Sequence, residues 1–195
     1  MHKARLEAFT DGVIAIIITI MVLELKVPEA EHLADLQPLI PKFISYVLSF
    51  IYVGIYWNNH HHTLQVTHSV SSGILWANLH LLFWLSLLPF TSGLIGENHF
   101  SQQPMLLYGF NLLLCAGAYT IFARALIKHH GHESLLARAF GKDRKGNVSL
   151  VLYIVGIALT FINPWFGFAT YVAVALIWLV PDRRMQRALQ EQHHG

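Results

Sequence analysis

The sequence predicts an all-α membrane protein with six transmembrane helices in each subunit. Composition is the first observation behind this prediction: 54% of the residues are hydrophobic, 12% are charged, and the mean hydropathy is +0.47. The second observation is a series of apolar runs close to the ~20 residues that a helix needs to cross a bilayer. A chain of this composition has too few polar residues to cover a soluble fold.

The predicted helices fill most of the chain, and we interpret residues 1–195 as a single six-helix transmembrane domain. Pro28 ends the first helix, because proline disfavours helical backbone at the residue before it. Pro89 is expected to bend the third helix. Asn163 and Pro164 alone separate the last two helices, which predicts a tight hairpin. The expected helices span about residues 5–26, 41–63, 72–96, 103–129, 147–163 and 164–181.

Charge placement predicts the orientation of these helices. Lys and Arg gather at the N-terminus, in the link between the fourth and fifth helices and in the C-terminal tail, whereas the link after the first helix is acidic. Short loops rich in Lys and Arg face the cytoplasm. We therefore expect both termini in the cytoplasm. A formal net charge of +2 is too small to indicate nucleic-acid binding.

The first helix combines an apolar stripe with a polar end. Residues three and four apart share a helix face, so Ile16, Ile20 and Leu23 form one stripe with Thr19 on its flank. From the residues alone, two interpretations of this stripe are open. It packs against neighbouring helices, as apolar stripes in membranes usually do, or it lines a pore.

The polar end of the first helix predicts a network with the next two helices. An ionisable group at the edge of a membrane segment is costly, so Arg5 and Asp11 need partners. In the orientation above, Trp57 and His60 end the second helix on the same side of the bilayer, and Asn78 lies in the third helix. We expect these five side chains to form a buried network. The alternative is that Arg5 extends to lipid headgroups and the histidines lie in the interface.

The histidines do not form a metal-binding motif. Three consecutive residues, His60 to His62, point about 100° apart on a helix, so they cannot converge on one ion. The chain also has no Gly-rich phosphate loop, no Gly-x-Ser-x-Gly and no zinc spacing. We therefore expect no metal, no cofactor and no enzymatic activity.

The opening signature carries a resemblance to a known family. Arg5-x-x-x-Phe9-Thr10-Asp11, which runs straight into an Ile-rich helix, resembles the Arg-x-x-x-Phe-Ser-Asp motif of the endolysosomal potassium channel family, transmembrane protein 175, and its bacterial homologues. Through this resemblance Phe9 and Thr10 join the expected network. The likeness extends over the first three helices by motif, and over the last three by hydropathy and order. Further residues that carry it are Trp57-x-x-His60, Asn78-Leu79 and Leu88-Pro89-Phe90-Thr91.

The resemblance implies a potassium-selective or weakly selective cation channel in a bacterial inner membrane. Bacterial members of the family are homotetramers in which the first helix lines a central pore. Stacked apolar side chains on that helix form the constriction in place of a carbonyl filter. By position from Asp11, the constriction falls on Ile16, Ile20 and Leu23, with Thr19 beside it. The partners implied are potassium ions, the lipid bilayer and other copies of the chain.

The sequence also departs from the family pattern and leaves alternatives open. Thr10 stands where serine is usual, which keeps the hydroxyl. The neighbours of His60 differ, so whether His60 or His61 joins the network is undecided. A proton- or cation-coupled transporter that uses Asp11 and His60 is the alternative function. A membrane metalloenzyme that uses the histidines is a third class.

Overall fold

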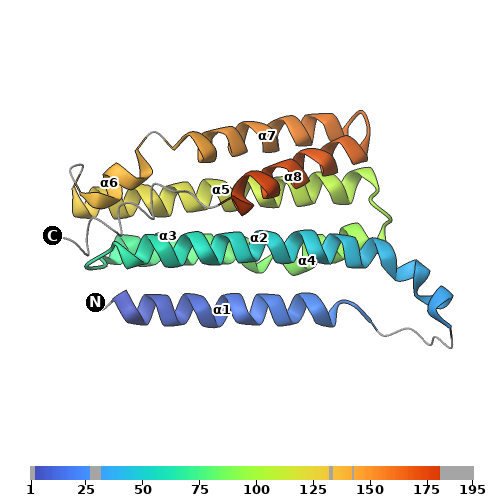
Figure 1. Ribbon diagram of the computed structural model, residues 1–195, viewed down its shortest axis with the longest axis horizontal. Coiled ribbons are helices and arrows are strands. Elements are labelled where there is room, and N and C mark those ends of the chain that lie inside the picture. The colour runs from blue at the N-terminus through green and yellow to red at the C-terminus, as the bar shows by residue number, and fades with distance from the viewer. Residues whose placement is uncertain (1–2, 27–31, 132–133, 142, 181–195) are drawn as a thin grey trace.

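The computed structural model describes residues 3–26, 32–131, 134–141 and 143–180, and within these ranges every regular element is a helix. The long helices lie side by side along one axis (Figure 1). The all-α prediction is therefore confirmed. In chain order the elements are α1 (Lys3–Leu23), the 3-10 helix η1 (Leu33–Leu39), α2 (Ile40–Gln65), α3 (Ser72–Ser86), α4 (Leu88–Glu97), α5 (Gln102–His130), α6 (Leu135–Phe140), α7 (Arg144–Thr160) and α8 (Pro164–Leu179).

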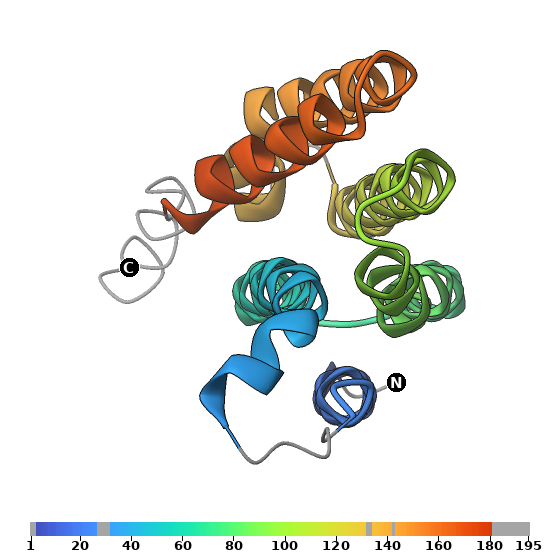
Figure 2. The same ribbon diagram turned by 90° about the vertical axis from the view of Figure 1, so that its right-hand side faces the viewer.

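Helix α1 lies at one edge of the bundle. Figure 2 shows α1 beside α2 and the α3–α4 pair, with α5 on the other side of that pair from α1 and α7–α8 at the opposite edge of the bundle. Accordingly, α1 packs against α2, α3 and α4. The start of α1, the α2–α3 link and α6 lie at one end of the bundle, and η1 and the α4–α5 and α7–α8 turns lie at the other (Figure 1). One side of α1 is therefore left without a neighbour from the described part of its own chain.

The third predicted helix is divided in two. Helix α3 ends at Ser86 and α4 begins at Leu88, so Leu87 is at once the C-cap of the first and the N-cap of the second. Pro89 lies in the first turn of α4, where its missing N–H leaves no bond unmade, but its ring prevents a straight continuation of α3. The bend that the sequence predicts at Pro89 is thus a break between two helices.

Within the described ranges, four helical segments are long and apolar enough to cross a membrane. They are Lys3–Leu23, Ala34–Gln65, Ser72–Glu97 and Gln102–His130. Helices α7 and α8 have 17 and 16 residues. At 1.5 Å a residue each is about 25 Å long, somewhat less than the ~30 Å of a typical hydrocarbon core. The presence of six spans therefore stays a prediction.

Two glycines bring α7 and α8 into close contact. A Cβ atom on Gly156 would collide with Thr170 Oγ1, and one on Gly167 would collide with Thr160 Oγ1 and lie 3.0 Å from the carbonyl oxygen of Gly156. The two backbones therefore approach more closely than side chains at these positions would allow. The turn between the helices is held by Asn163, whose side-chain oxygen accepts a 2.9 Å hydrogen bond from the backbone N–H of Trp165.

Candidate pore-lining helix and its polar contacts

Helix α1 presents two opposite faces. The buried face repeats at intervals of three or four residues and packs against α2, α3 and α4. This spacing keeps the buried side chains on one side of an α-helix. Its members are Leu6, Thr10, Ile14, Ile17 and Met21.

The opposite face of α1 is uncovered in a single chain, and it carries the predicted constriction. The side chains of Ile16, Ile20 and Leu23 are 58%, 43% and 76% exposed. Thr19 is exposed beside them, but its hydroxyl donates a 2.8 Å hydrogen bond to the carbonyl oxygen of Ile16. The stripe therefore offers aliphatic surface, and its one hydroxyl is already bonded to the helix backbone.

The first polar contact of α1 is fully buried. The Asn78 side-chain N–H donates to Thr10 Oγ1 at 2.9 Å, and Asn78 Oδ1 lies 2.9 Å from His60 Nε2. Because Asn78 Oδ1 can only accept, the His60 Nε2 carries the proton and donates. The His60 ring stacks on Phe122 of α5, with ring centroids 5.1 Å apart. This buried branch joins α1, α2 and α3 through side chains that water does not reach.

The second polar contact lies nearer the surface. Trp57 Nε1 donates a 2.9 Å hydrogen bond to Asp11 Oδ1, and the indole stacks on His61 with ring centroids 5.8 Å apart. His61 Nδ1 in turn lies 3.0 Å from Glu7 Oε1, and Gln65 Nε2 lies 2.9 Å from His61 Nε2. We call this set the surface branch. It joins α1 to the end of α2.

The structure thus divides the expected network into two branches. His61 contacts α1 directly through Glu7 in the surface branch, whereas His60 is linked to α1 through Asn78 in the buried branch. Arg5 and Phe9 lie on the exposed face of α1, and Arg5 makes no hydrogen bond or ion pair with the described part of the chain. The membership of Arg5 in the expected network therefore stays a prediction.

Sequence analysis missed Glu7 and Gln65. Glu7 lies four residues before Asp11, and His61 lies four residues after Trp57, so each pair shares a helix face. That spacing is the signal that could have identified a second contact one turn from the first. The described residues include no group of three or more His, Cys, Asp or Glu side chains that could hold a metal ion.

Comparison with known proteins places these features in a family. Residues 5–89 match the sequence profile described as endosomal/lysosomal potassium channel TMEM175. A potassium channel of Chryseobacterium sp. (strain P1-3) is 53% identical over 191 residues, which cover 98% of this chain and 100% of that protein. The chain belongs to the TMEM175 family. The family and the relative are both named as ion channels, so this protein is an ion-channel homologue and not an enzyme, as the sequence predicted.

Other TMEM175 relatives differ in extent and in name. The fold matches the crystal structure of a lysosomal potassium-selective channel TMEM175 homolog from Chamaesiphon minutus, with a TM-score of 0.79, 28% identity, and coverage of 92% of this chain and 97% of that one. The endosomal/lysosomal proton channel TMEM175 of Danio rerio is 36% identical over 73 residues, which cover 31% of this chain and 14% of that protein. The TMEM175 fold thus extends over nearly the whole chain.

Proposed function

We propose that this protein is a potassium-conducting channel in which four copies of α1 surround a central pore. The observation that carries the proposal is the uncovered stripe of Ile16, Ile20 and Leu23 on a helix at the edge of the bundle. The Chryseobacterium relative, which covers 98% of this chain, and the Chamaesiphon minutus homolog are both named as potassium channels. Helices α7 and α8 complete six spans of a bacterial inner membrane, and both termini lie in the cytoplasm.

Small residues support contact between α1 and a neighbouring copy. Ala8 and Gly12 precede Ile16 at intervals of four on the exposed face, and a Cβ atom on Gly12 would meet nothing within 4 Å. In membranes, small side chains at such intervals let helices approach closely. Arg5 and Phe9 lie on the same exposed side, where a neighbouring copy covers them. This arrangement gives Arg5 a partner that the described part of its own chain does not supply.

An aliphatic constriction has a definite physical consequence. Ile and Leu side chains have no oxygen atom to replace the hydration shell of an ion, so a narrow ring of them excludes water and blocks conduction. Opening widens the ring, and potassium then passes with much of its hydration shell. Selectivity for K⁺ over Na⁺ is therefore weaker than in a filter built from backbone carbonyl oxygens.

The test is planar-bilayer recording of the purified protein in KCl and NaCl. Ile16→Asn should raise single-channel conductance and weaken selectivity, because an amide hydrates the constriction. Ile154→Asn on α7 is the matched control, since Ile154 has the same side chain and is 57% exposed, against 58% for Ile16. Ile154→Asn should leave the currents unchanged. Equal currents from Ile16→Asn and the unmodified protein would exclude Ile16 from the pore.

Proton conduction is the second candidate function, and it rests on the name of the Danio rerio relative. The same recordings distinguish it, because a pH gradient shifts the reversal potential of a proton pathway, whereas a K⁺ gradient shifts that of a potassium pathway. A coupled transporter, the alternative class, would give saturable flux and no unitary currents.

A further inference from the structure

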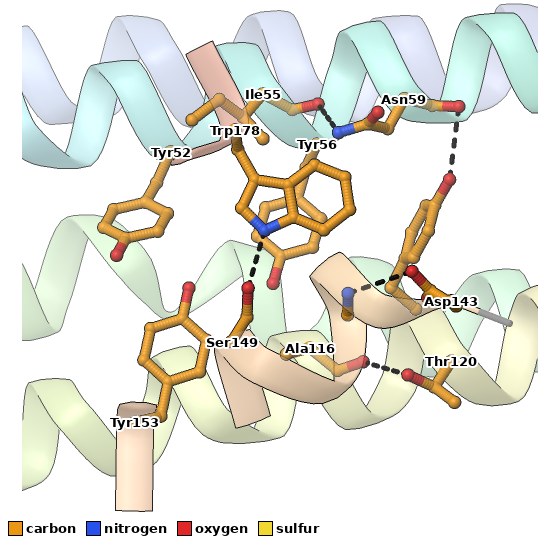
Figure 3. Close-up of a pocket in the computed structure, with 12 residues that line it drawn as sticks. Tyr52, Ile55, Tyr56, Asn59, Ala116, Thr120, Asp143, Ser149, Tyr153 and Trp178 are labelled. Carbon is orange, nitrogen blue, oxygen red and sulfur yellow. Dashed lines mark hydrogen bonds between the residues drawn. The ribbon is translucent and has the colours of Figure 1, made fainter. Parts of the chain in front are cut away.

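A second polar feature lies on the far side of the bundle from α1. Helices α2, α5, α7 and α8 line a cavity of about 30 Å³ (Figure 3). Aromatic rings form much of its wall, and hydroxyl groups of three helices face one another across it. Side chains that matter to the argument are Tyr52, Tyr56, Ala116, Ser149, Tyr153 and Trp178.

Several hydroxyls of this cavity already have protein partners, and Tyr52 and Ser149 are two of them. Tyr52 donates a 2.5 Å hydrogen bond to the carbonyl oxygen of Tyr171. Ser149 donates to the carbonyl oxygen of Lys145 at 2.8 Å and accepts from Trp178 Nε1 at 2.8 Å. Their donors are therefore used, and each oxygen keeps a lone pair that can accept a further bond.

The Tyr56 hydroxyl differs from these. Tyr56 is only 8% exposed, no hydrogen bond joins its hydroxyl to the described part of the chain, and the hydroxyl oxygen is not among the fully buried polar atoms, so it keeps some surface open to the cavity. Its ring packs edge-on against Tyr119, with centroids 6.0 Å apart, which directs the hydroxyl into the cavity (Figure 3). A hydroxyl inside a protein that has no protein partner is costly unless water bonds to it, and native proteins satisfy nearly all such groups.

We propose that this cavity binds one or two water molecules and that Tyr56 donates a hydrogen bond to the water. A volume of about 10–15 Å³ is enough for one molecule, whereas an aromatic ligand such as benzene needs a cavity of roughly 150 Å³. The bound water accepts from Tyr56 and donates to the free lone pairs of neighbouring hydroxyls. It thereby links α2 to the α7–α8 hairpin. This inference does not depend on the proposed function.

The test compares two Tyr→Phe variants by their thermal unfolding in detergent. Tyr56→Phe keeps the ring and removes the bond to water, so Tm should fall by a few degrees. Tyr171→Phe is the control: the Tyr171 hydroxyl is buried against Gly109 outside the cavity and lies near Thr160 without a hydrogen bond of ordinary geometry. Its removal should leave Tm unchanged or raise it.

A high-resolution density map gives a second measurement. We expect a solvent peak within hydrogen-bonding distance of Tyr56 Oη, and we expect Ala116→Val to remove that peak because the added methyl groups fill the cavity. A Tyr56→Phe variant with unchanged or higher Tm would overturn the proposal. A map in which the surrounding side chains are well defined but no solvent peak lies beside the Tyr56 hydroxyl would overturn the proposal as well.

Discussion

At the scale of single residues, Asn78 is the centre of the buried branch. Its amide nitrogen and oxygen are bonded to two different helices, through Thr10 and His60, and all three side chains are buried. No water can replace either bond. Losing one partner therefore leaves a polar group unsatisfied in an apolar surrounding, which costs more than the bond itself contributes.

The buried branch gives a prediction about Thr10. Thr10→Val preserves the shape of the side chain but strands the Asn78 N–H, and we expect the free energy of unfolding to fall by about 1–3 kcal/mol. Thr10→Ser keeps the hydroxyl and should lie close to the unmodified protein. Thermal or chemical unfolding in detergent measures both variants. A Val variant as stable as the Ser variant would contradict this account.

The surface branch gives a weaker prediction. Trp57→Phe removes the N–H that bonds to Asp11 but keeps a ring that can stack on His61. Trp57 is exposed, so water can replace the lost bond, and we expect a loss of about 1 kcal/mol or less, smaller than for Thr10→Val. Trp76→Phe, on an exposed Trp of α3, is the matched control and should have no effect on unfolding. A larger loss of unfolding free energy for Trp57→Phe than for Thr10→Val would show that burial does not determine the strength of the two branches.

The sequence could place these residues only in part. Trp57, His60 and Asn78 were expected near α1, because helix ends on one side of a bilayer must meet in a small bundle. The division into two branches was not predictable, since it depends on which way each side chain points around its helix axis. Arg5 shows a further limit, because its proposed partner belongs to another copy of the chain.

At the scale of elements, the α7–α8 hairpin depends on its glycines. Gly167→Ala places a methyl group against Thr160 and the carbonyl oxygen of Gly156, so the helices must separate. We expect the free energy of unfolding to fall by about 1–3 kcal/mol. Gly117→Ala in α5 is the control, because a Cβ atom there meets nothing within 4 Å. It should stabilise the protein by about 0.5–1 kcal/mol through helix propensity alone.

Changes of opposite sign in the free energy of unfolding for Gly167→Ala and Gly117→Ala would support close backbone contact as the cause. Equal changes would contradict it.

The sequence predicted the position of the α7–α8 hairpin, because Asn163 and Pro164 alone separate two apolar runs. Hydropathy carries no information on the distance between the two helices. The close approach follows from small residues on facing sides of two helices, and it becomes visible only when the pairing is known.

At the scale of the whole molecule, the uncovered face of α1 predicts an oligomer. Native mass spectrometry of the purified protein should show a species of four times the 22.1 kDa of one chain. Arg5→Ala should weaken this assembly while leaving the unfolding of the subunit nearly unchanged, because Arg5 bonds to no described residue of its own chain. Lys128→Ala, an exposed cation at the end of α5, is the matched control. A monomer in every detergent tested, with ion conduction retained, would contradict the tetramer.

The hydrogen bonds of α1 are distributed unevenly along its length. Lys3, Glu7, Thr10 and Asp11 all bond to α2 or α3, whereas the described residues of α1 after Asp11 form no hydrogen bond to another helix. The N-terminal part of the helix is thus fixed by hydrogen bonds to α2 and α3. Its C-terminal part is held against the described residues by apolar contacts alone, so it can tilt about the fixed end. Along the axis, Ile16 lies about 7.5 Å and Leu23 about 18 Å from Asp11, so a 10° tilt moves them by roughly 1.3 and 3 Å. Distances between spin labels at these two positions, in conducting and non-conducting conditions, would show whether the outer end moves further.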